Sequence, residues 1–389
     1  MEETIEKLAM ELHLDKSKWI LTKFGDVAIQ QKQSVDRENT ELMLYVKGEH
    51  MGSEDLHLRE WGELTDEYLG PAFIRKFEKG DILYGSRRTY LRKVVIAPFS
   101  GITSNTTFVA KANEEKIDKR LLPFVMMSEG FTENSIRNSK GSVNPYINWK
   151  DIANYEFLLP PKEEQAKLAE LLWAMDEVIE REKGVLDKFN NYLQTSLKAI
   201  FQLNTKRIPL IDLCIEAPKY GANSPSSEYD DIVRYLRITD IGDFGELNFD
   251  KVSATTHEDK YLLSYGDFLL ARTADPGRSY YYKNSDGICT HAGYLIKFRL
   301  NLNKIIPEYL YYYTQTTEFK SWINKTTRKG TISNINAAEF SKIKIPFVEI
   351  EKQKSSIQEI NTAYKFLMEV SSKLKSSQSL QKSLINQVF

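Results

Sequence analysis

Residues 159–165 read Leu159-Pro160-Pro161-Lys162-Glu163-Glu164-Gln165, and they open the stretch that decides the fold. From Leu168 to Ile200, positions spaced alternately four and three residues apart form a mostly apolar row, in which eight of ten side chains are Leu, Ile, Met or Phe. This alternation is the a/d seam of a heptad helix. The paired prolines end whatever precedes the helix, and acidic residues suit its first turn. The stretch therefore predicts one long helix with a single apolar seam.

The same pattern returns in the last part of the chain, from Phe347 to Phe389. Gln353 lies 188 residues after Gln165, and seven of the ten seam positions shifted by 188 are again apolar. Self-similarity over so long a period indicates duplication of a whole domain rather than a solenoid repeat. We assign the following residues to the two seams: Leu168, Leu172, Met175, Ile179, Leu186, Leu193, Ile360, Leu367, Val370 and Leu374.

Short segments upstream of the seams repeat at nearly the same offset, so the duplication covers more than the helices. Between these segments the two halves differ strongly, which favours two modules with the same task and different targets. The matching pairs are Gly80-Asp81-Ile82-Leu83 with Gly266-Asp267-Phe268-Leu269, Lys140-Gly141-Ser142 with Lys329-Gly330-Thr331, and Ile147-Asn148 with Ile335-Asn336.

The composition fits two ordinary globular domains. The chain has 389 residues, a formal net charge of −1 and 12% aromatic residues. The near-neutral charge means that any contact with nucleic acid depends on local basic patches. Only Cys214 and Cys289 are present, too few for a disulfide framework or a zinc cage. We see no signal peptide and no apolar run long enough to cross a membrane, so we expect a cytoplasmic protein.

We divide the chain into a first module at 1–159, a central helix at 160–203, a second module at 204–347 and a C-terminal helix at 348–389. Each module has a mixed α/β (α+β) pattern. In the first we expect a short amphipathic helix over 1–15, strands at 94–97, 106–109 and 154–159, and a helix over 117–127 interrupted at Pro123. In the second we expect strands at 233–238, 268–271 and 294–298, and a helix over 308–322.

An apolar seam needs a partner, and two partners are open. Each seam can pack on its own module, or the two helices can pack on each other. We favour an antiparallel coiled-coil pair, because the seams are long for one small module to cover. A helix of ~39 residues is about 58 Å long at ~1.5 Å per residue, more than one turn of DNA, which is about 34–36 Å.

In this order of motifs the sequence resembles the specificity (S) subunits of type I restriction-modification systems. The resemblance covers essentially the whole chain and is carried by the Pro160-Pro161 to Gln165 opening, the seamed helices, the repeated Gly-Asp segments and the duplication. The second copy departs from the pattern, since Pro346-Phe347 lacks the paired prolines. The resemblance implies two tandem DNA target recognition domains, separated by the two helices and related by a pseudo-two-fold internal repeat.

It also implies the partners. In such systems each recognition domain reads one half of a bipartite site in double-stranded DNA. The helices bind two modification (methyltransferase) subunits, which carry S-adenosylmethionine, and two restriction (motor/nuclease) subunits complete the complex. This chain itself is then expected to be non-catalytic, without a cofactor of its own.

Basic residues with interleaved aromatic residues are the candidates for contact with DNA. Arginine can contact phosphate or read guanine with two hydrogen bonds. The alternatives are an ordinary solvated strand face and, near Lys140 and Lys329, a plain turn. The candidate residues are Arg75, Lys79, Arg87, Arg88, Tyr90, Arg92, Lys93, Lys140, Arg272, Arg278, Tyr281, Lys283, Arg328 and Lys329.

Enzyme motifs are mostly absent. Asn144-Pro145-Tyr146 is a partial match to the catalytic loop of adenine methyltransferases, but it lacks the second proline, and we interpret it as a structural turn. No Walker A pattern is present. His50 and His57 lie near acidic residues, yet their spacing fits no helix ligand pair, so we expect no metal site. A self-sufficient N6-adenine methyltransferase and a coiled-coil scaffold that does not bind DNA remain the alternative functions.

Overall fold

The computed structural model describes residues 14–36, 39–65, 67–202, 206–256, 258–327 and 334–389. The chain divides into two compact units, Met1–Glu182 with Lys373–Phe389, and Lys183–Ser372. Each unit therefore combines one module with one half of each long helix, and its boundary cuts the helices in their middle. The helix expected over 1–15 falls mainly outside the described residues.

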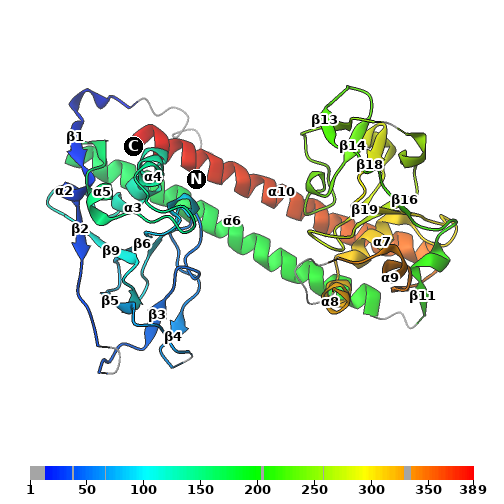
Figure 1. Cartoon of the computed structure of the whole chain (residues 1–389), viewed down its shortest axis with the longest axis horizontal. Coiled ribbons are helices and arrows are strands. Elements are labelled where there is room, and N and C mark those ends of the chain that lie inside the picture. Colours follow the sequence, from blue (N-terminus) through cyan, green and yellow to red (C-terminus); the bar gives the residue numbers. More distant parts are fainter. Residues whose placement is uncertain (1–13, 37–38, 66, 203–205, 257, 328–333) are drawn as a thin grey trace. The chain divides into compact units, whose positions relative to one another are not determined.

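The first unit contains two four-stranded sheets, a two-stranded ribbon of β1 and β10, and several short helices (Figure 1). Strands β2, β9, β6 and β7 form one sheet in that order, and β4, β3, β8 and β5 form another, in which only β3 and β8 run parallel. The strands are β1 (Ile20–Lys23), β2 (Ala28–Gln31), β3 (Leu44–Val46), β4 (Gly62–Glu63), β5 (Phe73–Phe77), β6 (Ile82–Gly85), β7 (Val94–Ile96), β8 (Gly101–Ser104), β9 (Thr107–Ala112) and β10 (Glu156–Leu159). The helices are η1 (Lys16–Lys18), α2 (Phe24–Val27), η2 (Thr89–Leu91), α3 (Leu122–Met127), α4 (Glu129–Arg137) and α5 (Trp149–Ala153).

The second unit repeats the first sheet and the ribbon. Strands β12, β19, β16 and β17 form its four-stranded sheet, β11 pairs with β20 as β1 pairs with β10, and β14 pairs with β18 in parallel. The strands are β11 (Arg207–Pro209), β12 (Lys219–Tyr220), β13 (Ser226–Glu228), β14 (Arg234–Leu236), β15 (Val252–Ala254), β16 (Asp267–Ala271), β17 (Ser279–Tyr281), β18 (Cys289–His291), β19 (Leu295–Arg299) and β20 (Lys344–Pro346). The helices are η3 (Leu210–Leu213), η4 (Ile238–Asp240), η5 (Asp259–Tyr261), η6 (Asn284–Asp286), α7 (Pro307–Thr314), α8 (Thr317–Thr326) and α9 (Ala337–Ser341).

Several expected elements differ in their limits. The helix expected over 117–127 begins only at Leu122, because Pro123 lacks an N–H and is tolerated only in a first turn. The helix expected over 308–322 is two helices, since the Thr316 hydroxyl accepts a hydrogen bond from the N–H of Phe319 (3.2 Å) and starts α8 anew. A strand that we did not expect, β8, follows β7 in the sequence and lies between β3 and β5 in the other sheet.

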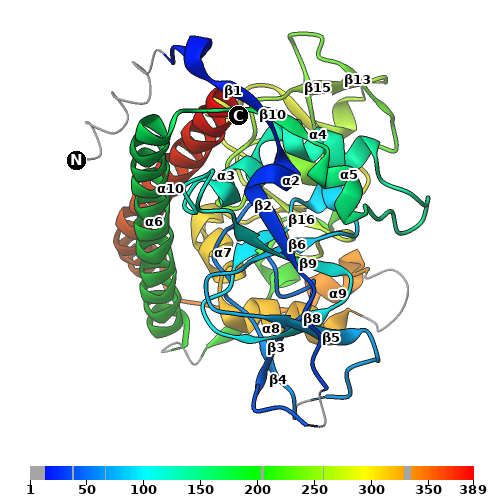
Figure 2. The same ribbon diagram turned by 90° about the vertical axis from the view of Figure 1, so that its left-hand side faces the viewer.

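Helices α6 (Lys162–Gln202) and α10 (Ile350–Val388) lie side by side in Figures 1 and 2. In the first unit, Phe157 just before α6 contacts Phe389 just after α10 (ring centroids 5.9 Å apart), whereas Glu182 pairs with Lys373 at 3.8 Å. Between these two contacts the residue number rises on the α6 side and falls on the α10 side, so the two helices run antiparallel in this unit. In the second unit, the tilted rings of Phe189 on α6 and Phe366 on α10 contact each other with centroids 4.1 Å apart.

Both expected partners of the seams are present. In the first unit, seam residues of α6 and α10 share one core with the module's own residues, and the same holds in the second unit. Leu168, Leu172, Met175, Ile179, Leu193, Ile360 and Leu367 are buried, whereas Leu186, Val370 and Leu374 are half-buried. Each module thus buries helix surface that we had assigned mainly to helix pairing.

A buried glutamine anchors the start of α6 to the first module. The Gln165 side chain accepts a hydrogen bond from the backbone N–H of Asp118 (2.7 Å). Its amide nitrogen donates to the carbonyl oxygens of Lys116 (3.2 Å) and Pro160 (2.9 Å). The side chain is 1% exposed, so these bonds satisfy backbone groups that water does not reach.

Gln353 repeats this anchor at the start of α10. It accepts from the backbone N–H of Ile306 (2.9 Å) and donates to the carbonyl oxygens of Lys304 (2.9 Å) and Val348 (2.8 Å). Each of these residues lies 188 positions after its counterpart in the first unit. The duplication therefore extends to individual hydrogen bonds.

The repeated Gly-Asp segments have a conformational explanation. Gly80 and Gly266 have φ of +91° and +94°, which side-chain-bearing residues rarely adopt. The following carboxylates close the turn, with Asp81 accepting from the N–H of Glu78 (2.8 Å) and Asp267 accepting in the same way three residues back (2.9 Å). These segments are turns that start β6 and β16, not ligand sites.

Candidate nucleic-acid interface

A basic loop follows β6 in the first unit and meets the segment before α5. Arg87 pairs with Tyr146 as an isolated bridge, and its guanidinium lies 6.0 Å from the centre of that ring. The N–H of Arg88 donates to the carbonyl of Pro145 (2.7 Å). Lys140 exchanges backbone hydrogen bonds with Tyr146 (2.8 and 2.9 Å). Segments more than 50 residues apart in the sequence thus form one exposed surface.

This surface has free cationic groups. Arg87, Arg88 and Lys140 are exposed, as is Tyr90, whose ring is 53% accessible. Among the described residues, neither Arg87 nor Arg88 is paired with a carboxylate, whereas Lys140 lies 3.7 Å from Asp151. We call this set of four residues with Tyr146 the first basic surface. It can donate hydrogen bonds to anionic oxygens or to base edges.

The turn that carries the first basic surface and the equivalent turn of the second unit are both strained. Arg88 has φ of +50° and Ala274 has φ of +62°, at equivalent positions after β6 and β16. Residues other than glycine adopt this conformation at a cost of roughly 1–2 kcal/mol. Equivalent backbone bonds hold both turns, because Ile147 donates to Ser86 and Ile335 donates to Arg272, each at 2.9 Å. The frame is shared, and only the side chains on it differ.

In the second unit the turn presents Arg272. Its guanidinium lies 5.0 Å from the centre of the Tyr220 ring, and its Nε donates to Oδ1 of Asn334 (3.1 Å). The backbone N–H of Arg272 donates to the backbone carbonyl of Tyr294 (2.9 Å), a residue that is 62% exposed. Sequence reasoning missed Tyr146, Tyr220 and Asn334, because nothing in the spacing of such distant residues indicates that they meet.

Other candidates lie apart from these loops or are already paired. Arg92 is mostly buried and bridges Glu54 and Glu129 (2.5 Å to the latter), so its charge is neutralised within the unit. Arg278 pairs with Asp275 (2.5 Å) and Asp243 (3.3 Å). We therefore leave these two arginines out of the proposed surfaces.

The remaining candidates divide by exposure. Arg75 is half-buried in β5, Lys79 is exposed in the turn after it, and Lys93 donates to the carbonyl of Gly48 (2.5 Å). Tyr281 is half-buried beneath Lys283, whose Nζ lies 4.9 Å from the ring centre. Arg328 and Lys329 lie outside the described residues.

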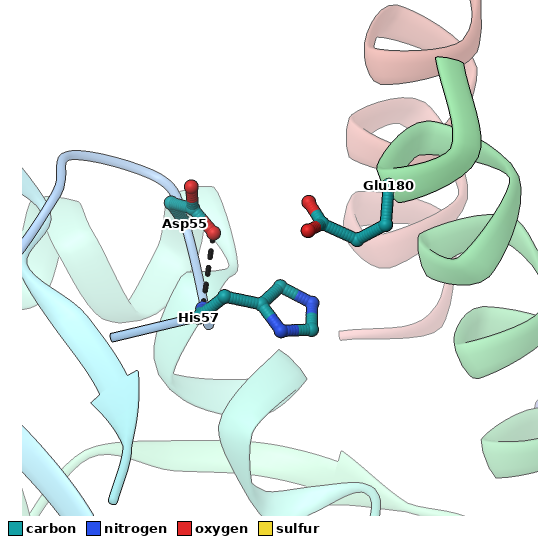
Figure 3. A group of neighbouring side chains, drawn as sticks. All are labelled: Asp55, His57 and Glu180. Carbon is teal, nitrogen blue, oxygen red and sulfur yellow. Dashed lines mark hydrogen bonds between the residues drawn. The ribbon is translucent and has the colours of Figure 1, made fainter. Parts of the chain in front are cut away.

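Three potential metal ligands also come together. Asp55, His57 and Glu180 have ligand atoms within 4.8 Å of one another, and Figure 3 shows the Glu180 side chain of α6 extending toward Asp55 and His57. Arg59 already donates to both Asp55 (3.0 Å) and Glu180 (2.7 Å), so a cationic group balances the carboxylates. His57 bonds to Asp176 on α6 (2.7 Å). The cluster fits a docking contact between α6 and the loop that joins β3 to β4, which carries Asp55, His57 and Arg59. We propose no metal there.

The contact between His57 and Asp176 predicts that the stability of the first unit depends on pH. The hydrogen bond that His57 donates to the Asp176 carboxylate raises the pKa of His57 above its usual value of 6.5, and burial opposes this shift. When the pKa of a histidine is higher in the folded state than in the unfolded state, its protonation stabilises the fold. This stabilisation is complete at a pH below the unfolded-state pKa and is lost as the pH rises through the folded-state pKa. The advantage of wild type over His57→Gln should be about 1 kcal/mol or less, because the imidazole is 37% exposed, and should shrink as the pH rises from about 6.5 through the raised pKa of the folded state.

Urea unfolding of both proteins at several pH values measures this difference. His50→Gln is the matched control, because the pKa of His50 is lowered by burial. An advantage over His57→Gln that stays constant or grows with pH contradicts the assignment.

Comparison of the sequence with protein families finds the same duplication that the two units show. The model of the type I restriction modification DNA specificity domain matches the chain twice, over residues 17–191 and 194–376. The chain belongs to the type I restriction-modification specificity family. The two matched copies of the specificity domain coincide with the duplication seen in the sequence and in the hydrogen bonds of the two units.

Curated relatives agree with the assignment to the specificity family. The EcoDI specificity subunit of Escherichia coli is 28% identical over 182 residues, 46% of this chain and 39% of that protein. The MjaVIII specificity subunit of Methanocaldococcus jannaschii is 24% identical over 361 residues, 82% of this chain and 83% of that protein. The chain thus spans well under half of the first relative and most of the second.

Solved structures share the fold of this specificity-family chain. The S subunit of a type I system from M. genitalium superposes with a TM-score of 0.58 at 14% identity, covering 97% of this chain and 98% of that one. A chain from a type I system described for its complex assembly gives 0.52 at 18% identity, covering 95% and 98%. The self-sufficient methyltransferase alternative is not favoured by the match to the specificity-domain model. Among the described residues, no helix combines the length and apolar character needed to cross a membrane.

Proposed function

We propose that the chain is the DNA-specificity subunit of a type I restriction-modification complex, in which each unit reads one half of a bipartite site. One observation carries this proposal. Two units with the same frame present different arginine–tyrosine pairs, Arg87 with Tyr146 and Arg272 with Tyr220. A shared frame with exchanged side chains is what reading two unlike half-sites requires.

The charges support contact with DNA despite the net charge of −1. Local cations without acidic partners attract phosphate, and arginine also reads base edges in the major groove. Arg87 and Arg88 meet this condition among the described residues. Phosphate contacts position a protein on DNA, whereas base contacts provide its specificity.

We also propose that α6 and α10 bind the modification subunits, which carry S-adenosylmethionine, and that two modification and two restriction subunits complete the assembly. Exposed side chains on both helices support this, because Tyr and Met are enriched in protein interfaces relative to the rest of a protein surface. In the second unit, Tyr192 is 57% exposed, Met368 42% and Val185 39%. Helices that run through both units also offer a means of setting the number of base pairs between the half-sites.

Replacing Arg87 and Arg88 together by Ala tests the function. In a complex with modification subunits, binding should weaken by roughly 10- to 100-fold, because one base contact is worth about 1–3 kcal/mol and phosphate contacts add to it. If either arginine reads a base, only one half of the methylated sequence should become relaxed. Selection from random DNA, followed by sequencing of the methylated sites, measures both effects.

Lys119→Ala is the matched control, because Lys119 is an exposed cation of the same unit away from this surface. An unchanged affinity and methylation pattern for the double variant rejects the first basic surface. Binding without any sequence preference by the wild-type complex rejects the proposed function and favours a scaffold.

A further inference from the structure

Arg272 is held more firmly than a side chain that only meets phosphate needs to be. It follows β16 directly, and both its N–H and its carbonyl are hydrogen-bonded, to Tyr294 and Ile335 (2.9 Å each). Its guanidinium rests on the Tyr220 ring, and its Nε donates to Asn334. The ring contact and the hydrogen bond together restrain the guanidinium, and among the described residues its two Nη groups have no hydrogen-bond or ion-pair partner.

A cavity of about 600 Å³ adjoins this guanidinium. Small residues form much of its lining, including Ala222, Ala292 and Gly293, so backbone lies near its surface. The other arginine of the lining, Arg237, is bound by the carboxylate of Asp240 through two nitrogens (3.0 and 2.7 Å). Arg272 is therefore the cation of this lining that remains able to bind a ligand.

We propose that Arg272 reads a guanine in the second half-site, and this rests on the proposed function. Two coplanar N–H groups match the O6 and N7 acceptors of guanine in the major groove. Tyr220 and Asn334 orient the fork before DNA arrives, so little side-chain entropy is lost on binding. The small residues beside it leave room for a base edge to approach.

The first unit cannot read the same base in the same way. The residue equivalent to Arg272 is Ser86, which is buried and whose hydroxyl bonds to the carbonyl of Thr106. There the stacked arginine is the next residue, Arg87, and its aromatic partner comes from the segment before α5. The predicted guanine contact through Arg272 therefore belongs to the second half-site alone.

The test uses the full chain in complex with modification subunits, on the DNA sequence that this complex methylates. Each guanine of the second half-site is replaced in turn by 7-deazaguanine, which lacks N7 and still pairs with cytosine. At one position, wild type should lose affinity, and Arg272→Lys and Arg272→Ala should lose roughly 5- to 150-fold of their preference for guanine. Tyr220→Leu should lose part of it, and Lys260→Ala, an exposed cation of the same unit, none.

Three results overturn the inference. Arg272 variants that keep full preference for guanine, or a second half-site without guanine, show that another residue reads the base. Uniform weakening on all sequences, with the slope of log affinity against log salt reduced by about one, shows a phosphate contact instead. Arg272→Lys keeps the positive charge, so it separates lost base reading from lost charge, and retained affinity for other sequences shows that the variant is folded. If wild type binds without sequence preference, the proposed function fails as well, whereas a specific wild type confines the failure to Arg272.

Discussion

Replacing Gln165 by Glu should lower the free energy of unfolding of the first unit by about 3–5 kcal/mol. The carboxylate can still accept the N–H of Asp118, but it cannot donate to the carbonyls of Lys116 and Pro160. It would place a negative charge against two carbonyl oxygens at a site that is 1% exposed. An unsatisfied buried polar group costs about 1–3 kcal/mol, and an uncompensated buried charge costs about 3–5 kcal/mol.

The loss should shrink as pH falls, because a protonated carboxyl is uncharged and can donate one hydrogen bond. Urea unfolding followed by tryptophan fluorescence suits the first unit, which contains four of the five tryptophans, Trp19, Trp61, Trp149 and Trp173. Gln378→Glu makes the same chemical change at an exposed position of the same unit and should leave stability nearly unchanged. Equal urea midpoints for Gln165→Glu and wild type would show that the anchor contributes nothing.

The equivalent change Gln353→Glu should act on the second unit, with Trp322 as its reporter and Gln358→Glu as its exposed control. The two anchors make the same three kinds of hydrogen bond, so we expect losses of similar size. A large loss in one unit and none in the other contradicts their equivalence.

Leu172→Ala and Leu367→Ala should each cost about 2–5 kcal/mol, the range for truncating a large buried side chain. Both leucines are 0% exposed, Leu172 in the core of the first unit and Leu367 in that of the second. Val185→Ala on α6 is the control, because Val185 is 39% exposed and its truncation should cost less than about 0.5 kcal/mol.

Urea midpoints, read separately from the first-unit tryptophans and from Trp322, measure these costs. If both seam variants unfold at the same urea concentration as Val185→Ala, the seams do not belong to the cores. A loss confined to helix content with the modules intact would favour helix pairing alone over the shared cores seen here.

Periodicity made the long helices predictable. A seam alternating four and three residues is a local pattern, and the central helix expected at 160–203 is α6, Lys162–Gln202. The duplication was equally visible, because Gln165 and Gln353 occupy the same place in two copies. The limits of elements were harder to predict where one residue type fits two structural positions. Pro123 is an example, because proline either interrupts a helix, as we expected, or occupies its first turn, as the structure has it.

The sequence by itself determined that the chain has two copies of one frame, each followed by a seamed helix, because repeats and heptads are written in spacing. Only the tertiary structure decided which cations are available to a ligand. Arg92 and Arg87 look alike in the sequence, yet Arg92 is bound by Glu54 and Glu129, whereas Arg87 rests on Tyr146. Arg272 and Tyr220 are separated by 52 residues, and their contact depends on β19, which pairs with both β12 and β16. Contacts of this kind are made by folding, so no local pattern records them.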